Sequence, residues 1–503
     1  MLKVKRLKFS EEKLKIIFYL FLFLFIFYFN YRLPLDPDFG WHLKYGEEVV
    51  LNKRVLTRDI FSHTFIGKEI IDTEWLIEAL FYLIFSYWSF WGLSFFSAII
   101  TTFAFFLPSL VFNGSFFKKF LITLWALYGS SSVLNVGPRP QNLSLFFFSL
   151  LVIFIFKYQE KKEIKYFLFL PLIFLLWSNM HPAFIVGLGV FFGFLVSEFL
   201  LADRKEKNKT FILFLIFLFS FLTSSLHPYS SEGGGKVFSF ELVKSLAFPL
   251  SFIDENNPLG RVRVTIGEWL PPTLVDFSGT LFFLGIAFSV GIFLTSPFSK
   301  KDFQNLFLNI GIIYFSTLSA RNVPFFFIFF IPLLINKIDE EKLLSAKFKK
   351  IFPMLNFSSL MIMSFFIPKI FILHNKIVTQ GSSLEAYCEA RRLPCKAIDF
   401  IKKEKPDGNM FNHYNLGGFL IWQLPEYPVF IDGRVPGGEI YSEFETVINL
   451  KEGWDKILEK YKVEWMIVPP NKLFEDFLTE EKTWEKIYSD QTAIILKKVK
   501  GKK

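Results

Sequence analysis

Long apolar runs, separated by short polar segments, are the dominant pattern along this chain. A helix needs about 20 mostly apolar residues to cross the hydrocarbon core of a bilayer. About eleven stretches approach that length, and they lie near residues 14–33, 89–112, 117–136, 140–157, 165–179, 182–201, 210–227, 276–296, 304–320, 321–337 and 351–373. The pattern therefore predicts a polytopic α-helical membrane protein with about 11 transmembrane helices.

Basic residues set the expected orientation of these helices, because lysine and arginine in short loops resist translocation. With the spans given above, the basic clusters all fall on one side of the membrane. They are Lys3 to Lys8, Lys118 and Lys119, 157–165, 203–209, Lys300 and Lys301, and 337–350. The amino terminus is therefore predicted to be cytoplasmic, and an odd number of crossings places the carboxyl-terminal region outside.

Residues 75–88 are also apolar, but counting them as a span would put most of the basic loops outside. We interpret them as an interfacial helix, since Trp75, Tyr87 and Trp88 suit the headgroup level of a membrane. The prediction is a helix that lies along the outer surface before the second span begins.

Beyond the last apolar stretch the composition becomes charged and mixed. Short strand-like runs at 409–412, 429–432, 465–468 and 493–497 alternate with helical runs near 396–403, 439–449, 453–461 and 472–478. This alternation predicts a small external α/β domain over residues 375–503. Residues 1–374 then form the transmembrane domain, with a first external loop at 34–88 and another at 228–275.

The composition agrees with a membrane protein, since 52% of the residues are hydrophobic and 71 are phenylalanine. The net charge of +10 would suggest a nucleic-acid partner in a soluble protein, but the basic residues here gather in the predicted cytoplasmic loops. Topology explains this charge, so no nucleic-acid partner is expected. The first apolar segment lacks a small-residue cleavage site, and we interpret it as a retained span.

The chain has two cysteines, Cys388 and Cys395, and both fall in the predicted external region. In an oxidising compartment they are candidates for a disulfide that closes a small loop. Two free thiols in a helix are the alternative.

Polar and ionisable residues gather at the external ends of the predicted spans, whereas the span interiors hold almost no charge. The densest group is Asp36-Pro37-Asp38-Phe39-Gly40-Trp41-His42, immediately beyond the first span. Ionisable groups at such a place are costly and are usually functional. A transporter would be expected to carry them near the bilayer midplane, so their distribution favours binding or chemistry at the outer surface.

The motif Asp36-Pro37-Asp38 followed by Trp41-His42, in a long first external loop, resembles the GT-C superfamily of membrane glycosyltransferases. This superfamily includes oligosaccharyltransferases and protein mannosyltransferases, which use sugars carried on polyprenyl phosphate or pyrophosphate. The resemblance in layout covers roughly residues 1–340. Further motifs are similar to those of a bacterial branch, and they are Arg139-Pro140-Gln141, Asn179-Met180-His181, Gly267-Glu268-Trp269, Gly417-Gly418 and Asp432-Gly433-Arg434. The resemblance implies a GT-C-like fold and an inverting transferase that depends on a lipid-phosphate sugar.

Glycosyl transfer from a lipid phosphate needs a base or a charge that readies the acceptor. The resemblance implies that Asp36 or Asp38 has this catalytic role. In an extended segment, which Pro37 favours, the two carboxylates would point the same way. The alternative is that they cap a helix at residues 39–50.

The departing phosphate needs cations that keep their charge, and arginine offers a bidentate fork for it. Arg139, Arg321 and His181 are the candidates for binding the donor phosphate, with interfacial anchoring or a structural turn as the alternatives. The candidate substrate-binding residues are Trp41, His42, Gln141, Glu268 and Trp269.

Asp36 and Asp38 are also candidate metal ligands, together with His42 and a more distant Glu74 or Glu268. Their oxygen and nitrogen atoms suit Mg²⁺ or Mn²⁺. Nothing in the spacing requires a metal, and hydrogen bonding within the loop is the alternative.

The sequence therefore favours a glycosyltransferase that moves a sugar from a polyprenyl-phosphate donor to a lipid, glycan or protein acceptor. The expected location is the inner (plasma) membrane, with a multi-pass chain and a site that faces the periplasm or exterior. A lipid-linked-oligosaccharide transporter or flippase is one alternative, and the uncharged spans count against it. A non-catalytic membrane assembly factor is the other, and the presence of Asp36 and Asp38 counts against it.

Overall fold

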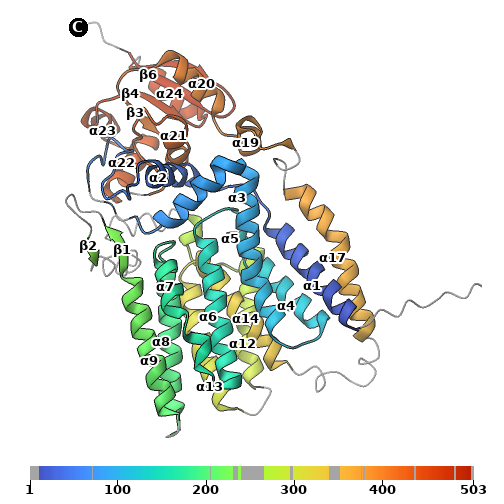
Figure 1. Cartoon of the computed structure of the whole chain (residues 1–503). Coiled ribbons are helices and arrows are strands. Elements are labelled where there is room, and N and C mark those ends of the chain that lie inside the picture. Colours follow the sequence, from blue (N-terminus) through green and yellow to red (C-terminus); the bar gives the residue numbers. More distant parts are fainter. Residues whose placement is uncertain are drawn as a thin grey trace, which may run out of the picture.

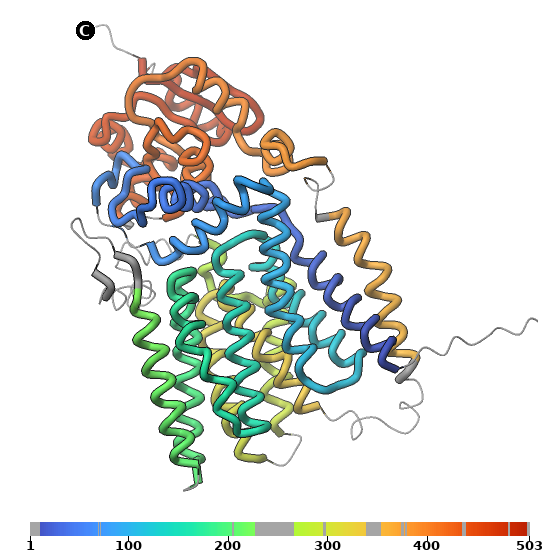
Figure 2. Tube along the Cα trace, in the orientation of Figure 1, coloured from blue at the N-terminus to red at the C-terminus, as the bar shows by residue number. Residues whose placement is uncertain are grey.

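The computed structural model describes residues 11–499, apart from residues 69, 71, 204–205, 230–235, 239–265, 295–297, 339–351, 375–376, 378–379, 435–437 and 481–482. Helices that stand side by side form the larger part of the molecule, and a mixed sheet with its own helices lies at one end of them (Figure 1). The chain enters the helical part with α1 and ends in the sheet region (Figure 2).

The long helices account for the apolar runs of the sequence. They are α1 (Glu11–Asn30), α3 (Trp75–Val111), α4 (Phe116–Gly129), α6 (Gln141–Lys161), α7 (Leu170–Ser178), α8 (Phe184–Leu201), α9 (Lys207–Ser224), α12 (Phe277–Gly291), α13 (Lys300–Thr317), α14 (Val323–Lys337) and α17 (Phe352–His374). Each predicted span lies on one of these helices. At the edge of the bundle, α17 packs against α1 (Figure 1).

Within the described residues, seven helical segments are long and apolar enough to cross a membrane unaided. They are Trp75–Val111, Gln141–Lys161, Phe184–Leu201, Lys207–Ser224, Phe277–Leu294, Ala320–Lys337 and Met354–Leu373. The protein is therefore a polytopic helical membrane protein. The number of about eleven spans stays a prediction.

Helix α14 is buried on all its faces from Val323 to Ile335. A helix that is apolar all round belongs in the interior of a bundle. Its phenylalanines contact rings on neighbouring helices, such as Phe148 on α6 and Phe282 on α12. Aromatic packing around α14 thus forms the centre of the bundle.

Helix α3 bends where the interfacial helix was expected to meet the second span. Ser89 interrupts the helical geometry with φ 52° and ψ −150°. Its hydroxyl donates to the carbonyl oxygen of Ser382, 3.0 Å away. The first part of α3, before Ser89, lies across the end of the bundle beneath α2 (Phe39–Leu51) (Figure 1).

The carboxyl-terminal region contains a four-stranded sheet in the order β3 (Asn409–Asn412), β4 (Val463–Val468), β6 (Ile494–Lys498) and β5 (Trp484–Ser489). The β3–β4 pair is parallel, and the other two pairs are antiparallel. One face packs against α20 (Cys395–Glu404) and α21 (Gly417–Gln423). The other face packs against α22 (Gly438–Ile448), α23 (Trp454–Lys460) and α24 (Lys472–Glu480), so the region has three layers.

Three of the four predicted strands belong to this sheet, but the run at 429–432 does not. Val429 forms an isolated parallel bridge with Ser62 of the first loop. The Asn412 side chain accepts the N–H of Phe430 at 2.7 Å and donates to the carbonyl oxygen of Ile431 at 2.8 Å. The backbone groups of this segment therefore bond to the first loop and to the Asn412 side chain, so they do not pair with a strand of the sheet.

Arg434 ties the carboxyl-terminal region to the first loop. Its side chain is 9% exposed and lies 2.5 Å from Asp432 and 3.3 Å from Asp59. It also donates to the Tyr45 hydroxyl on α2 at 2.9 Å. Burial alone would lower the pKa of Arg434, but Asp432 beside it holds that pKa well above its ordinary value. Most of the predicted external loop 228–275 lies outside the described residues.

Replacing Arg434 with methionine should destabilise the protein by about 3–5 kcal/mol, because two buried aspartates lose their cation. Thermal unfolding in detergent would show this as a lower midpoint for Arg434→Met. Arg54→Met is the matched control, since Arg54 pairs with Glu48 at the surface and is 53% exposed. Equal midpoints for the two variants would contradict the anchoring role of Arg434.

Candidate active site at the outer end of the bundle

Arg139 joins three segments that are far apart in the sequence. It lies between Pro138 and Pro140, just before α6, and it forms ion pairs with Asp36 in the linker after α1 and with Glu268 in η2 (Gly267–Trp269). The side chains of Arg139 and Asp36 are only 10% and 6% exposed. A charge so far from water is stable only with partners of this kind.

Arg321 continues this chain of charges from the opposite side. It lies in η4 (Ala320–Asn322), with Nη1 at 3.6 Å from Glu268 Oε1 and Nε donating to Gln141 Oε1 at 3.2 Å. The Gln141 amide in turn donates to the Arg321 carbonyl oxygen at 2.9 Å. The guanidinium also lies 5.9 Å from the ring centroid of Trp269. We call Asp36, Arg139, Glu268 and Arg321 the arginine–carboxylate chain.

The two acidic residues of the Asp-Pro-Asp motif lie in a turn. Asp36 Oδ1 accepts the backbone N–H of Asp38 at 2.9 Å, and Asp38 has helical backbone angles as the N-cap residue of α2. The segment is therefore not extended through Asp38, because the Asp36 side chain closes a local turn over Pro37 and Asp38. The Asp38 carboxylate makes no capping hydrogen bond.

The environments of these two carboxylates push their pKa values apart. Burial alone would raise the pKa of Asp36, but the Arg139 guanidinium and the Asp38 N–H hold it below its ordinary value. Burial and the neighbouring Asp36 carboxylate raise the pKa of Asp38 to about 8. One carboxylate is thus kept ionised, while the other titrates near neutral pH.

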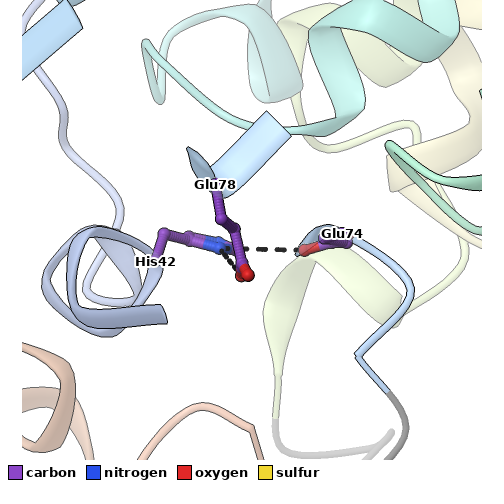
Figure 3. Close-up of side chains that lie close together, drawn as sticks. All are labelled: His42, Glu74 and Glu78. Atoms are coloured by element: carbon purple, nitrogen blue, oxygen red, sulfur yellow. Dashed lines mark hydrogen bonds and ion pairs between the residues drawn. The ribbon is translucent and has the colours of Figure 1, made fainter. Parts of the chain in front are cut away.

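A second group of ionisable side chains lies beside this turn, and we call it the histidine–carboxylate cluster. His42 on α2 points toward Glu74 and Glu78 at the start of α3 (Figure 3). His42 Nδ1 lies 2.8 Å from Glu78 Oε1 and 3.8 Å from Glu74 Oε2. Burial lowers the pKa of His42 to about 3, so its imidazole is neutral at physiological pH.

His181 faces the same cluster from the loop between α7 and α8. Its Nδ1 accepts the N–H of Ala183 at 3.2 Å and lies 2.8 Å from the Ser144 hydroxyl. Because Nδ1 accepts, the neutral ring carries its proton on Nε2, which lies 3.6 Å from Glu74 Oε1. His181 is therefore placed as a hydrogen-bond donor toward the site.

Glycines let the carboxyl-terminal region approach the acidic turn closely. A Cβ atom on Gly433 would lie 1.6 Å from Asp38 Oδ1, and one on Gly418 would lie 2.4 Å from the Pro37 carbonyl oxygen. A Cβ atom on Gly40 would lie 2.0 Å from the Gly418 carbonyl oxygen. The Gly417-Gly418 and Asp432-Gly433-Arg434 motifs thus shape the turn that holds Asp36 and Asp38.

Trp41 lies inside this interface. Its ring centroid is 3.7 Å from that of His42 and 5.5 Å from that of Tyr45. A Cβ atom on Gly418 would approach its ring to 3.2 Å. Trp41 therefore packs α2 against its neighbours, whereas Trp269 lies under Arg321.

The carboxyl-terminal region also holds the segment that precedes Asp36. Tyr387 on α19 (Leu384–Arg391) donates to the Pro34 carbonyl oxygen at 2.9 Å, and Arg391 donates to that of Leu35. Cys388 and Cys395 form a disulfide that joins α19 to the start of α20.

The structure brings the predicted residues Asp36, Arg139, Gln141, Glu268 and Arg321 into direct contact, but it does not group Asp36 and Asp38 as metal ligands. Among the described residues, the group with three ligand atoms within 4.8 Å of one another is His42, Glu74 and Glu78. Asp36 already has the positive charge of Arg139 beside it. The candidate metal site therefore moves from the motif to its neighbours on α2 and α3.

Sequence reasoning missed Glu78 as a site residue. Glu78 is fully buried, and it is the only charged residue between Trp75 and Tyr87. A single acidic residue in an apolar run, four positions after Glu74, was the available signal, since such a spacing puts both on one helical face.

These features define a helical membrane protein with a buried ionic site where the bundle meets a carboxyl-terminal sheet region. No protein-family model matches the chain, and comparison with curated proteins gives no match. Solved structures do match. The oligosaccharyltransferase of Archaeoglobus fulgidus, tethered to an acceptor peptide, aligns with a TM-score of 0.56 at 13% identity over 91% of this chain and 69% of its own.

ArnT from Cupriavidus metallidurans bound to undecaprenyl phosphate aligns with a TM-score of 0.52 at 12% identity, over 98% of this chain and 99% of its own. Both proteins belong to the GT-C superfamily of glycosyltransferases. The chain therefore has the GT-C fold, as its sequence motifs predicted.

The unequal titration of the acidic turn can be observed directly. The spectrum of Asp38→Asn is subtracted from the infrared spectrum of the wild type. At a pH about two units below the Asp38 pKa of about 8, the difference should show the band of a protonated carboxyl group. At a pH about two units above that pKa, the band should be absent. The sign follows from the raised pKa, since Asp38 keeps its proton until the pH exceeds that value. Glu268→Gln is the control, because Arg321 and Arg139 hold the pKa of Glu268 below its ordinary value against the effect of burial. A band that persists at the higher pH would contradict the assignment.

Proposed function

We propose that this protein transfers a sugar from a polyprenyl-phosphate-linked donor to a lipid, glycan or protein acceptor at the outer face of the cell membrane. The observation that carries the proposal is the arginine–carboxylate chain, which places two fixed cations beside the acidic turn. The GT-C fold supports it, because one similar structure holds undecaprenyl phosphate and another an acceptor peptide.

The acidic turn is proposed to ready the acceptor. In an inverting transfer, an acceptor hydroxyl or amide attacks the anomeric carbon, its proton passes to a base, and the phosphate departs with the electrons of the broken C–O bond. A base works best when its pKa lies near the working pH. Asp38 meets that condition with a pKa of about 8, while the ionised Asp36 can orient the acceptor and stabilise positive charge on the sugar.

The two arginines are proposed to hold the donor phosphate. Arg139 is paired with both Asp36 and Glu268, whereas Arg321 is 31% exposed and its ion pair with Glu268 is longer, at 3.6 Å. A phosphate can therefore approach Arg321 first and compete with Glu268 for both guanidinium groups. The Nε2–H of His181 is a further donor on the same side, and Gln141 and Trp269 orient the Arg321 side chain.

The proposed orientation has the amino terminus in the cytoplasm and the active site outside. Several lysines lie at the end of the bundle away from the acidic turn, and each contacts a neighbouring helix or loop. Lys118 donates to the Ile335 carbonyl at the end of α14, and Lys337 pairs with Asp302 at the start of α13. Lys300 pairs with Asp203 in the same way. This concentration of lysines is typical of a cytoplasmic side, and it supports a chain of about eleven spans.

Replacing both aspartates, in Asp36→Asn with Asp38→Asn, should abolish transfer and leave membrane insertion intact. Loss of general-base catalysis alone costs about 10²–10⁴-fold in rate. The measurement is transfer of radiolabelled sugar from a panel of polyprenyl-phosphate sugars by the purified protein in nanodiscs. Asp407→Asn, an exposed aspartate of the carboxyl-terminal region, is the control and should retain activity. Unchanged transfer in the double variant would remove the catalytic assignment, and a folded wild type without turnover on any donor would favour a transporter or an assembly factor.

Arg321→Gln should raise the KM for the donor by about 10- to 100-fold, since a hydrogen bond to a charged group contributes about 1.5–3 kcal/mol. Arg321→Lys should recover part of this loss because it restores the charge without the fork. Lys300→Gln, at the opposite end of the bundle, serves as the control and should leave the KM unchanged. A KM for Arg321→Gln equal to that of the wild type would show that the donor phosphate binds elsewhere.

A further inference from the structure

Lys119 carries a buried positive charge at the end of the bundle away from the acidic turn. It lies near the start of α4, and only 2% of its surface is exposed. Within the described residues it forms no ion pair with a carboxylate, and the charges that act on it are those of Lys15 and Lys118, both positive. A buried ammonium group without a counter-charge is costly, so this place suits an anionic ligand.

Tyr19 on α1 connects this charge to the surface of the bundle. Lys119 Nζ donates to the Tyr19 hydroxyl oxygen at 2.6 Å, so the O–H of Tyr19 must donate to another acceptor. The part of the chain that the structure describes supplies no such acceptor. Edge contacts with Phe106 and Phe116, at ring-centroid distances of 6.1 and 6.4 Å, hold the Tyr19 ring in place. The hydroxyl therefore offers a hydrogen bond to a ligand, with a fixed cation behind it.

Lys15 adds a second cation on the same face of α1. It lies four residues before Tyr19, a spacing that makes the two side chains neighbours on a helix. Lys15 is exposed, whereas Tyr19 is partly buried. Glu11 and Glu12 occupy the first turn of α1, but among the described residues neither forms an ion pair with Lys15. Two ammonium groups and a phenol thus gather where no acidic side chain neutralises them.

An apolar surface runs along α1 beside these polar groups. Ile16 is 67% exposed and Leu20 is 53% exposed, and each directly follows one of the polar residues in the sequence. Helix α1 begins at the end of the bundle away from the carboxyl-terminal region (Figure 1). Basic sites between transmembrane helices near the cytoplasmic surface bind anionic lipid head groups, and lipid chains cover the apolar surface next to them.

We propose that Lys15, Tyr19 and Lys119 bind the phosphate of an anionic phospholipid in the leaflet at this end of the bundle. The phosphate accepts the Tyr19 O–H and pairs with the Lys15 ammonium group, while Lys119 adds charge from behind Tyr19. The acyl chains lie along Ile16 and Leu20. A zwitterionic lipid carries a cationic head group that the same lysines repel, so the site selects a net negative charge. This inference goes beyond the proposed sugar transfer and does not depend on it.

The test uses the full-length protein, freed of lipid in detergent, to which defined lipids are added back. Native mass spectrometry counts the bound lipid across a titration, and the thermal unfolding midpoint is followed in parallel. The wild type should bind one phosphatidylglycerol at least about tenfold more tightly than phosphatidylcholine, and its midpoint should rise when it is loaded. Glycerol 1-phosphate, which has the phosphate without acyl chains, should neither bind nor raise the midpoint.

Lys119→Met removes the buried charge and should weaken phosphatidylglycerol binding at least about tenfold. Its lipid-free form should unfold at the temperature of the lipid-free wild type or higher, which shows that weaker binding is not misfolding. Lys15→Gln, at an exposed position, should weaken binding by about fivefold. Lys300→Gln is the matched control, because Lys300 lies at the same end of the bundle, is 60% exposed and pairs with Asp203. It should bind the lipid as the wild type does.

Equal binding of phosphatidylglycerol and phosphatidylcholine by the wild type, or binding of neither, would overturn the proposal. Wild-type affinity in both Lys15→Gln and Lys119→Met would also overturn it, because Tyr19 alone would then satisfy Lys119. Glycerol 1-phosphate that binds as tightly as phosphatidylglycerol would make the ligand a soluble phosphate and so overturn the lipid assignment. None of these results bears on sugar transfer, because no donor or acceptor is present.

Discussion

The buried guanidinium of Arg139 is the constraint on which the rest of the site depends. It is only 10% exposed, so its charge depends on Asp36 and Glu268 remaining beside it. These residues come from the linker after α1, from the start of α6 and from η2, which packs on η4. The Arg139 charge thus fixes the relative positions of the linker after α1, the start of α6, η2 and, through its packing on η2, η4.

The first loop lies between the bundle and the carboxyl-terminal region and is held from both sides. Arg139 holds Asp36 from the bundle, whereas Gly433 and Gly418 allow the carboxyl-terminal backbone to lie against Asp38 and Pro37. Arg434 adds a second buried charge that joins this region to Asp59 and Tyr45. The candidate site is therefore built at a junction, which is where ligand sites commonly occur.

Two neighbouring groups of ionisable residues use opposite electrostatic arrangements. In the arginine–carboxylate chain each acid lies beside a guanidinium, so Asp36 and Glu268 stay ionised. In the histidine–carboxylate cluster the acids outnumber the available cations, and burial raises the pKa of Glu74 to about 8 and that of Asp72 to about 6. The first group is stabilised by fixed positive charge, whereas in the second group burial favours the protonated form of the acids.

The sequence by itself determined the membrane class, the apolar helices, most strands of the carboxyl-terminal sheet and the GT-C resemblance. Hydrophobic length and period are local properties, so the runs that form α6 or β3 are visible without any partner. It also marked Asp36, Arg139, Glu268 and Arg321, because ionisable residues gather at the external ends of the predicted spans while the span interiors hold almost none. Only the tertiary structure decided that Arg139 pairs with Asp36, that residues 429–432 bond outside the sheet, and that Glu78 meets His42. Those outcomes depend on which groups share a buried space, and sequence spacing carries no record of contacts between segments tens or hundreds of residues apart.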